Sequence, residues 1–108
     1  MNTNATLTLV DTLDEALAMR DWLGQRREWL GFDIETTGLN VGRDRIRMVQ
    51  VGDQDTGWAV PYERWSGLIH DTLGRYDSSS MVAHNALFDL KFLKRDGIII
   101  PDHLVHDT

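Results

Sequence analysis

Two acidic residues, Asp33 and Glu35, flank a single apolar residue in a segment that alternates between apolar and small or polar residues. Side chains two residues apart in a β-strand point to the same side, about 6.5–7 Å apart along the strand. Two carboxylates at this spacing could bind a pair of divalent cations about 4 Å apart. A solvated polar face on an edge strand gives the same pattern, and the pair alone favours that simpler interpretation.

A third acidic residue, Asp89, lies in a largely apolar stretch of the chain. Asn85 marks the expected start of a helix here, so Asp89 lies about one turn in, near the free N–H groups and the positive end of the helix dipole. A carboxylate among apolar neighbours has a high desolvation cost, which a bound cation would offset. The alternative is that Asp89 faces solvent beside Lys91 or Lys94.

The four histidines carry weaker signals. His84 precedes the same helix, and a strand-end ring hydrogen-bonded to the backbone explains it equally well. The other three lack the spacing of a zinc site and are expected at the surface: His70, His103 and His106.

The segments around these residues predict the elements that must position them. Strands are expected over residues 6–10, 29–35, 45–52, 58–60, 81–84 and 104–107, helices over 13–26, 65–76 and 85–95, and a polar loop over 77–80. Thr12 and Glu15 form a capping box, and Gly97 fits a helix C-cap. Three strands joined by tight turns predict an antiparallel meander, and the later strand–helix–strand order adds parallel strands beside it. The expected fold class is α/β, a mixed sheet flanked by helices.

Composition sets limits on the class of protein. The 108 residues allow at most one domain, and 42% hydrophobic with 26% charged residues is typical of a soluble globular protein. Disulfides and cysteine-based zinc sites are excluded because the chain has no cysteine. The sequence shows neither a signal-peptide pattern nor an apolar run long enough to span a bilayer, so a cytoplasmic protein without membrane partners is expected.

The net charge of −6 argues against a broad electrostatic grip on nucleic acid. It is compatible with a small site that binds divalent metal and, through the metal, phosphate. Three arginines alternate after the first acidic pair: Arg43, Arg45 and Arg47. They could line a nucleic-acid path, although a solvated strand face is the favoured interpretation.

The segments that hold the three acidic residues resemble the first two motifs of the DnaQ-like, or DEDD, 3′→5′ exonucleases. The first, FDIETTGL, covers Phe32–Leu39, and the second, VAHNALFDLKFL, covers Val82–Leu93. MVQVG at Met48–Gly52 resembles that family's second strand. HDT at His106–Thr108 resembles the strand end that follows the second motif in the proofreading domain of DNA polymerase I and in ribonuclease D. Either motif alone is weak, but the two in this order, on a strand and a helix, are a fairly specific signal.

The resemblance implies a ribonuclease H-like fold and two bound Mg²⁺ or Mn²⁺ ions for hydrolysis of the terminal phosphodiester. Asp33 would bridge both ions, Glu35 would hold the ion that binds the attacking water, and Asp89 would ligate the second ion. Hard cations prefer oxygen ligands, which agrees with carboxylates at all three positions.

The resemblance also assigns substrate-binding positions. Leu39 matches the apolar residue that wedges against the terminal base, and Thr36 matches the position whose backbone meets the 3′ end. Asn85 matches a polar residue near the scissile bond. A single-stranded 3′ end can be held by stacking and backbone contacts without reading sequence.

The chain departs from the family pattern at the third motif, a Tyr or His followed by a fourth Asp. No Tyr follows Tyr76. His103 and Asp107 have the H-x-x-x-D spacing, but they lie too close to the second motif and overlap the expected last strand. We therefore expect residues 1–108 to be the N-terminal part of a single exonuclease domain, incomplete at its C-terminus.

Three functions follow from these observations. The leading hypothesis is a metal-dependent 3′→5′ exonuclease acting on a single-stranded 3′ end of DNA, as the proofreading module of a DNA polymerase I-like protein with a polymerase domain in the parent chain. A ribonuclease D-like enzyme that trims RNA 3′ ends is the alternative within the same chemistry. The missing third motif motivates another alternative, a non-catalytic remnant of the fold that binds nucleic acid or a polymerase partner.

Overall fold

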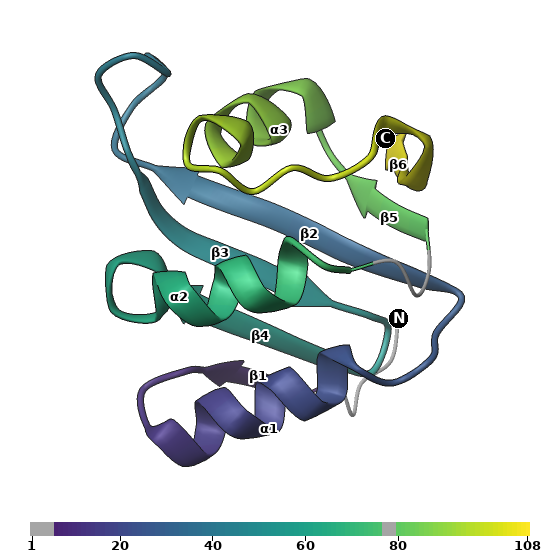
Figure 1. The fold of residues 1–108 in the computed structure, drawn as a ribbon. Coiled ribbons are helices and arrows are strands. Elements are labelled where there is room, and N and C mark those ends of the chain that lie inside the picture. Colours follow the sequence, from purple (N-terminus) through teal and green to yellow (C-terminus); the bar gives the residue numbers. More distant parts are fainter. Residues whose placement is uncertain (1–5, 77–79) are drawn as a thin grey trace.

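The computed structural model describes residues 6–76 and 80–108, which form one six-stranded sheet and three α-helices (Figure 1). The strands are β1 (Thr6–Leu9), β2 (Trp29–Thr36), β3 (Ile46–Gly52), β4 (Thr56–Pro61), β5 (Ser80–Ala83) and β6 (Val105–Asp107). The helices are α1 (Leu13–Leu23), α2 (Tyr62–Leu73) and α3 (Ala86–Arg95), with a 3₁₀ turn at Asp102–Leu104. The predicted polar loop covered residues 77–80, of which 77–79 lie outside the described residues and Ser80 is the first residue of β5.

The strand order is β1-β4-β3-β2-β5-β6. Strands β2, β3 and β4 form the predicted antiparallel meander, and β5 and β6 add to the β2 side in parallel, also as predicted. At the other edge, β1 pairs in parallel with β4. The mixed α/β sheet expected from the sequence is therefore confirmed.

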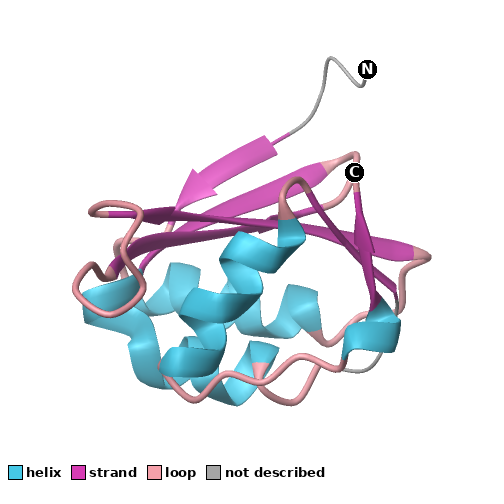
Figure 2. Ribbon diagram, turned by 90° about the horizontal axis from the view of Figure 1, so that it is seen from above, coloured by secondary structure: helices cyan, strands magenta, loops and turns pink. Residues whose placement is uncertain are grey.

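All three helices pack on one face of the sheet, and no helix of the described residues covers the other (Figure 2). This asymmetry follows from the alternation in β2, where Leu30, Phe32 and Ile34 are buried toward the helices. Asp33 and Glu35 point to the uncovered side and are exposed. Each large side chain buried in the core contributes roughly 1.5–3 kcal/mol to stability, so the strand cannot slip by one residue without losing its buried set. The core thereby fixes which way the two carboxylates point.

Four helix boundaries differ from the prediction: the end of α1, both ends of α2, which ends at Leu73 rather than at residue 76, and the start of α3, which begins at Ala86 rather than at residue 85. α1 begins at the predicted capping box, where Glu15 N–H donates to the Thr12 hydroxyl over 3.2 Å, but it ends at Leu23 rather than at residue 26, because Gly24 caps it. α2 begins three residues earlier than predicted, directly after Pro61. Its backbone leaves the helical region at Trp65 (φ −117°, ψ 21°), whose indole N–H donates to the Val10 carbonyl over 3.1 Å. This tertiary bond at the kink is invisible in a periodicity pattern.

α3 has well-defined ends. Its N-cap residue, Asn85, has a left-handed backbone with φ 57°. Gly97, predicted as the C-cap, lies one residue past the cap with φ 89°. The N–H of Ile98 donates to Leu93 O over 2.8 Å and that of Gly97 to Lys94 O over 3.0 Å, the bonding pattern of a Schellman motif.

In residues 6–76 and 80–108, no helix has the length and apolar character that crossing a bilayer requires.

Two glycines, one on a left-handed backbone and one inside a helix, test whether Gly97 is required by its backbone conformation. Gly97→Ala places a Cβ on a left-handed backbone and should lower the free energy of unfolding by about 1 kcal/mol. Gly67→Ala lies within α2, where an added Cβ meets nothing within 4 Å, and should raise it by up to about 1 kcal/mol. Urea unfolding of both variants measures the two changes. Equal effects of the same sign would contradict the left-handed requirement at Gly97.

Candidate functional site

The candidate site lies where β2 continues past its neighbour β5. The two strands pair only from Trp29 to Gly31, so the second half of β2 has no strand partner on that side. Its other side stays paired to β3, with Asp33 opposite Gln50. The backbone N–H groups along the unpaired edge need another partner, because unsatisfied buried donors are costly.

Asp89 of α3 supplies that partner. Its carboxylate accepts a hydrogen bond from the backbone N–H of Ile34, which holds α3 against the unpaired edge of β2. Only 2% of the Asp89 surface is exposed, and it is the sole charged residue buried to this extent among the described residues. The alternative interpretation, a solvent-facing Asp89 beside Lys91 or Lys94, is therefore wrong.

The Asp33 carboxyl lies within hydrogen-bonding reach of Asp89. Burial, and then the negative charge of Asp33, raise the pKa of the Asp89 carboxyl to about 7, while the Ile34 amide opposes the rise. The second carboxylate oxygen of Asp89, Oδ2, is buried and has no hydrogen-bond partner among the described residues. A hard cation between the two carboxylates would satisfy this oxygen and remove their mutual repulsion, so the pair fits a divalent metal.

The structure brings together two of the three predicted metal ligands. Glu35 lies two residues beyond Asp33 on the same exposed face of β2. Within residues 6–76 and 80–108, no group of three His, Cys, Asp or Glu side chains is gathered closely enough to hold a metal ion. The sequence-based expectation of a three-carboxylate cluster thus stands as a proposal, with Asp33 and Asp89 as its observed core.

The predicted substrate-binding residues lie on the same elements as this pair or directly beside them in sequence. Thr36 ends β2, and its hydroxyl donates to the Gly38 carbonyl over 2.7 Å. Leu39 extends from the following loop with 84% of its surface exposed. Asn85 is exposed at the start of α3 and makes no side-chain capping bond. An exposed leucine after β2 and an exposed amide at the start of α3 are groups that a ligand could contact.

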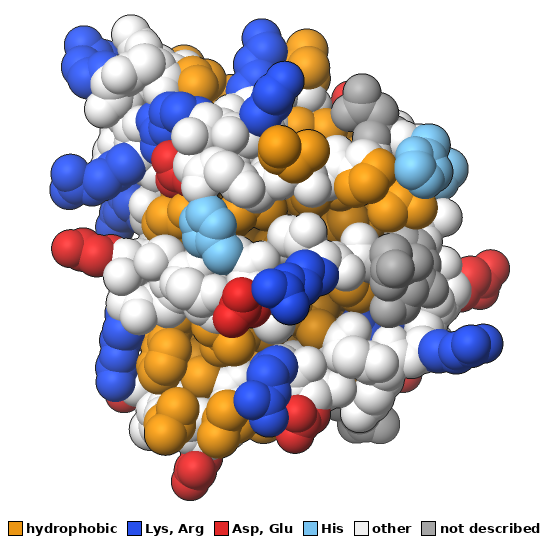
Figure 3. Space-filling view, viewed as in Figure 1, with side chains coloured by type: hydrophobic (Ala, Val, Ile, Leu, Met, Phe, Trp, Pro, Cys, Tyr) orange, Lys and Arg blue, Asp and Glu red, His pale blue; other side chains and the backbone are white. Residues whose placement is uncertain are grey.

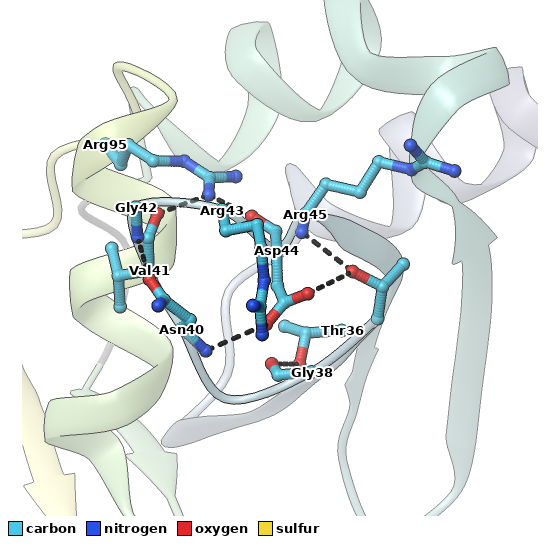
Figure 4. Close-up of polar contacts among 10 residues, drawn as sticks. Thr36, Gly38, Asn40, Val41, Gly42, Arg43, Asp44, Arg45 and Arg95 are labelled. Carbon is cyan, nitrogen blue, oxygen red and sulfur yellow. Dashed lines mark hydrogen bonds and ion pairs between the residues drawn. The ribbon is translucent and has the colours of Figure 1, made fainter.

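Sequence reasoning missed Arg95 and Asp44, which join α3 to the loop between β2 and β3 (Figure 4). Arg95 Nη1 donates to the carbonyl oxygens of Val41, over 2.6 Å, and of Asp44. The Asp44 carboxylate in turn accepts from the Asn40 N–H over 2.9 Å. The sequence carries a signal only for the local bonds, because a short Asp/Asn-rich segment predicts a turn closed by its own side chains.

The histidines follow the prediction with one exception. His84, His103 and His106 are exposed. His70 is half-buried instead of lying at the surface, because its Nε2 is 3.3 Å from the hydroxyl of Tyr62.

Basic side chains gather near the site in spite of the acidic total. Figure 3 shows Lys and Arg side chains along the top and upper left of the molecule, over α3 and the β2–β3 loop. We call the exposed basic residues on these elements and at the start of β3 the basic patch: Arg43, Arg45, Arg47, Lys91, Lys94 and Arg95. This patch lies on α3, the helix that carries Asp89, and on the segment that follows β2, in a chain whose net charge is −6.

Comparison with known proteins places this geometry in context. No model of a known protein family matches the chain. A DNA polymerase of Mycobacterium phage L5 is 35% identical over 91 residues, which cover 82% of this chain and 15% of the relative. DNA polymerase I of Aquifex aeolicus is 39% identical over 71 residues, covering 65% of this chain and 11% of the relative. The chain spans less than a fifth of the length of either relative.

Solved structures share the fold. The catalytic core of RRP6 from Trypanosoma brucei superimposes with a TM-score of 0.76 at 18% identity, covering 96% of this chain and 29% of that one. RNase D of Escherichia coli gives a TM-score of 0.72 at 16% identity over 94% of this chain and 27% of that one. Brucella melitensis NrnC with bound Mg²⁺ gives 0.63 at 25% identity over 94% of this chain and 47% of that one.

The chain belongs to the DnaQ-like 3′→5′ exonuclease superfamily. As a DnaQ-like chain it has the ribonuclease H-like sheet that the resemblance implied, with the first motif on β2 and the second on α3. The segment proposed to resemble the strand end after the second motif is β6, where Asp107 pairs with Ala83. His103 and Asp107, which have the spacing of a third motif, are both exposed.

We expect Asp89→Asn to remove a pH dependence from the stability of the metal-free DnaQ-like chain. The pKa of Asp89 is about 7 in the folded chain and 3.8 as its ordinary value, so between these values the folded chain holds a proton that the unfolded chain has released. The free energy of unfolding of the wild type should therefore fall as pH rises through this range. Near the upper end of this pH range, the free energy of unfolding of Asp89→Asn should exceed that of the wild type by roughly 1–3 kcal/mol.

Urea unfolding in EDTA at the two ends of this pH range measures the effect. Asp71→Asn, at an exposed aspartate of α2, is the matched control and should keep the wild-type pH dependence. An Asp89→Asn variant whose stability changes with pH as steeply as that of the control would contradict a proton held at Asp89.

Proposed function

We propose that the protein is a metal-dependent 3′→5′ exonuclease that removes terminal nucleotides from a single-stranded 3′ end of DNA. The observation that carries the proposal is the buried Asp89 carboxylate, whose Oδ2 lacks a hydrogen-bond partner while the Asp33 carboxyl lies within reach. A structural role for Asp89 needs only the bond from Ile34, so the unsatisfied oxygen beside a second acid points to a cation.

Asp33, Glu35 and Asp89 would hold two Mg²⁺ or Mn²⁺ ions. All three offer hard carboxylate oxygens, the ligand type that such ions prefer. Glu35 is exposed on the same face as Asp33, so its side chain has room to turn toward a bound ion. The likeness to an NrnC structure with bound Mg²⁺ supports the assignment. Paired divalent cations, when bound, supply an activated water and stabilise the leaving oxygen in an in-line displacement.

The remaining side chains around the pair would bind and orient the substrate. Leu39 would pack against the terminal base, the backbone at Thr36 would meet the 3′ end, and Asn85 would contact the sugar–phosphate near the scissile bond. The exposed side chains of the basic patch would attract the polyanionic strand, and the positive end of α3 would favour phosphate. A strand held at its end in this way is recognised without regard to its sequence.

DNA is the proposed substrate because relatives at 35% and 39% identity are named as DNA polymerases. A polymerase domain in the parent chain, and proofreading as the physiological role, are proposed on the same ground. Trimming of RNA 3′ ends is the second candidate, favoured by the fold shared with RNase D, which is described as an exoribonuclease of structured RNA processing. That likeness is at 16% identity and therefore bears on the fold alone.

A non-catalytic remnant of the fold is the third candidate, motivated by the absence of a three-ligand cluster among the described residues. Calorimetric titration of the protein with Mn²⁺ separates it from the enzyme. Two bound ions and measurable hydrolysis would exclude the remnant, whereas no binding and no hydrolysis by the full-length protein would exclude the enzyme.

The decisive prediction concerns Asp33→Ala combined with Glu35→Ala in the full-length protein. Removing two of three carboxylates should lower Mg²⁺-dependent digestion of a 3′-labelled single-stranded DNA by about a thousandfold or more, because the divalent ions would lose most of their protein ligands. Each tenfold step in rate corresponds to about 1.4 kcal/mol of lost transition-state stabilisation. Asp71→Ala is the control and should digest at the wild-type rate. An unchanged rate in the double variant would refute the proposed active site.

The same assay, run with matched DNA and RNA strands, discriminates the two substrates. We expect faster digestion of the DNA strand and no digestion of either strand in EDTA. Faster digestion of RNA would favour the trimming enzyme over the proofreading module.

A further inference from the structure

The loop between β2 and β3, residues 37–45, is closed by a dense set of internal hydrogen bonds (Figure 4). The Asp44 carboxylate accepts from the Asn40 N–H over 2.9 Å and from the Thr37 hydroxyl over 3.3 Å. The Arg45 N–H donates to the Thr37 hydroxyl over 3.0 Å, and the Gly42 N–H donates to the Asn40 side chain over 2.8 Å. A loop with this many bonds of its own has a defined shape rather than a range of shapes.

Gly38 shows how tightly the loop is packed. A Cβ added at Gly38 would collide with the Asp44 carboxylate, so that carboxylate occupies the space of the missing side chain. Leu39 follows directly and is 84% exposed. The internal hydrogen bonds of the loop therefore hold a backbone shape in which the large apolar side chain of Leu39 is exposed to solvent.

Arg95 fastens this loop to α3. Its Nη1 donates to Val41 O over 2.6 Å and also to Asp44 O. The guanidinium is itself held, because its Nε donates to the Asp96 carboxylate over 3.0 Å and its plane lies over the Phe92 ring at 5.1 Å. A planar group fixed on one edge and donating from the other is a rigid connector between two elements.

We propose that Arg95 is a positioning residue that sets where Leu39 stands relative to the carboxylate pair. Asp89 and Arg95 lie on the same helix, about 9 Å apart along its axis. Asp89 fixes the helix to the edge of β2, and Arg95 fixes the loop to the helix. The inference rests on the proposed function, in which Leu39 meets the terminal base and the carboxylate pair holds the metal beside the terminal phosphodiester.

The physical basis is preorganisation. A loop without these bonds would have to become ordered when the strand end binds, and the entropy lost in ordering it would weaken binding. Arg95 makes no contact with the carboxylate pair itself, so it should act on binding of the 3′ end more than on the hydrolytic step. Its effect should also depend on the shape of the guanidinium, since Arg95 uses two separate nitrogens for Asp96 and for the two carbonyls, and the single nitrogen of a lysine does not span that width.

The test compares Arg95→Ala, Arg95→Lys and the control Arg75→Ala in the full-length protein, where Arg75 is another exposed arginine, two residues beyond the end of α2. For digestion of a single-stranded DNA 3′ end, Arg95→Ala should raise KM by about tenfold and leave kcat within about twofold. Arg95→Lys should recover only part of the loss. Amide hydrogen exchange over residues 37–45 should become faster in Arg95→Ala while the sheet stays protected.

Two results would overturn the proposal for Arg95 alone. One is an active protein in which Arg95→Ala changes neither KM nor loop exchange. The other is an Arg95→Lys variant indistinguishable from the wild type, which would mean that Arg95 acts only by its charge. A wild-type protein without nuclease activity, whose loop exchange still rises in Arg95→Ala, would overturn the proposed function and with it the role in substrate positioning.

Discussion

The arrangement of this site depends on one constraint, the placement of the Asp89 carboxylate in a dry contact between α3 and β2. A carboxylate that is 2% exposed and within reach of Asp33 cannot stay ionised beside an ionised partner without compensation. Either a proton or a cation must enter the pair. Because the pKa of Asp89 is about 7, a proton provides this compensation only weakly at neutral pH, and a divalent ion can displace it. The local chemistry therefore favours a divalent metal ion at the carboxylate pair.

The sheet topology creates the place for this contact. Since β5 stops pairing with β2 at Gly31, the N–H of Ile34 lies at an open edge, and a helix that starts right after β5 can approach it. The same strand keeps its other edge paired to β3, so its alternation stays regular through Glu35. One strand thus serves two purposes: its inward residues anchor the core, and its outward residues carry acids at a fixed spacing. Ligands on such a strand have little freedom to drift from one another.

The predictable parts of this structure were those encoded in local patterns. Alternation in β2 determined the side on which Asp33 and Glu35 lie, and the helical period around Asn85 located Asp89 one turn into α3. The errors arose where tertiary contacts overrode local signals, as at Trp65, whose bond to Val10 kinks the predicted start of α2.

Other features had no local signal at all. Arg95 meets the loop across 51 and 54 residues of sequence, a contact that only the packed fold creates. A basic residue in the last turn of a helix is already explained by the helix dipole. The sequence therefore offers no reason to expect that Arg95 also bonds to the loop. The half-buried His70 is a similar case, because its partner Tyr62 lies eight residues away across the kink in α2.

The helix α3 connects the two halves of the proposed site, and its ends show why a short helix suffices. Its first turn is held at the edge of β2 by Asp89, and its last turn is closed by the Schellman bonds around Gly97 and extended by the Arg95–Asp96 pair. If this ten-residue helix rotated or slid, it would break the buried bond of Asp89 to β2 or the bonds of Arg95 to the loop. On the proposed function, a strand end packed against Leu39 would have its terminal phosphate at a set distance from the acidic pair. Selectivity for a frayed or single-stranded end would then follow from the fixed distance between Leu39 and the two carboxylates.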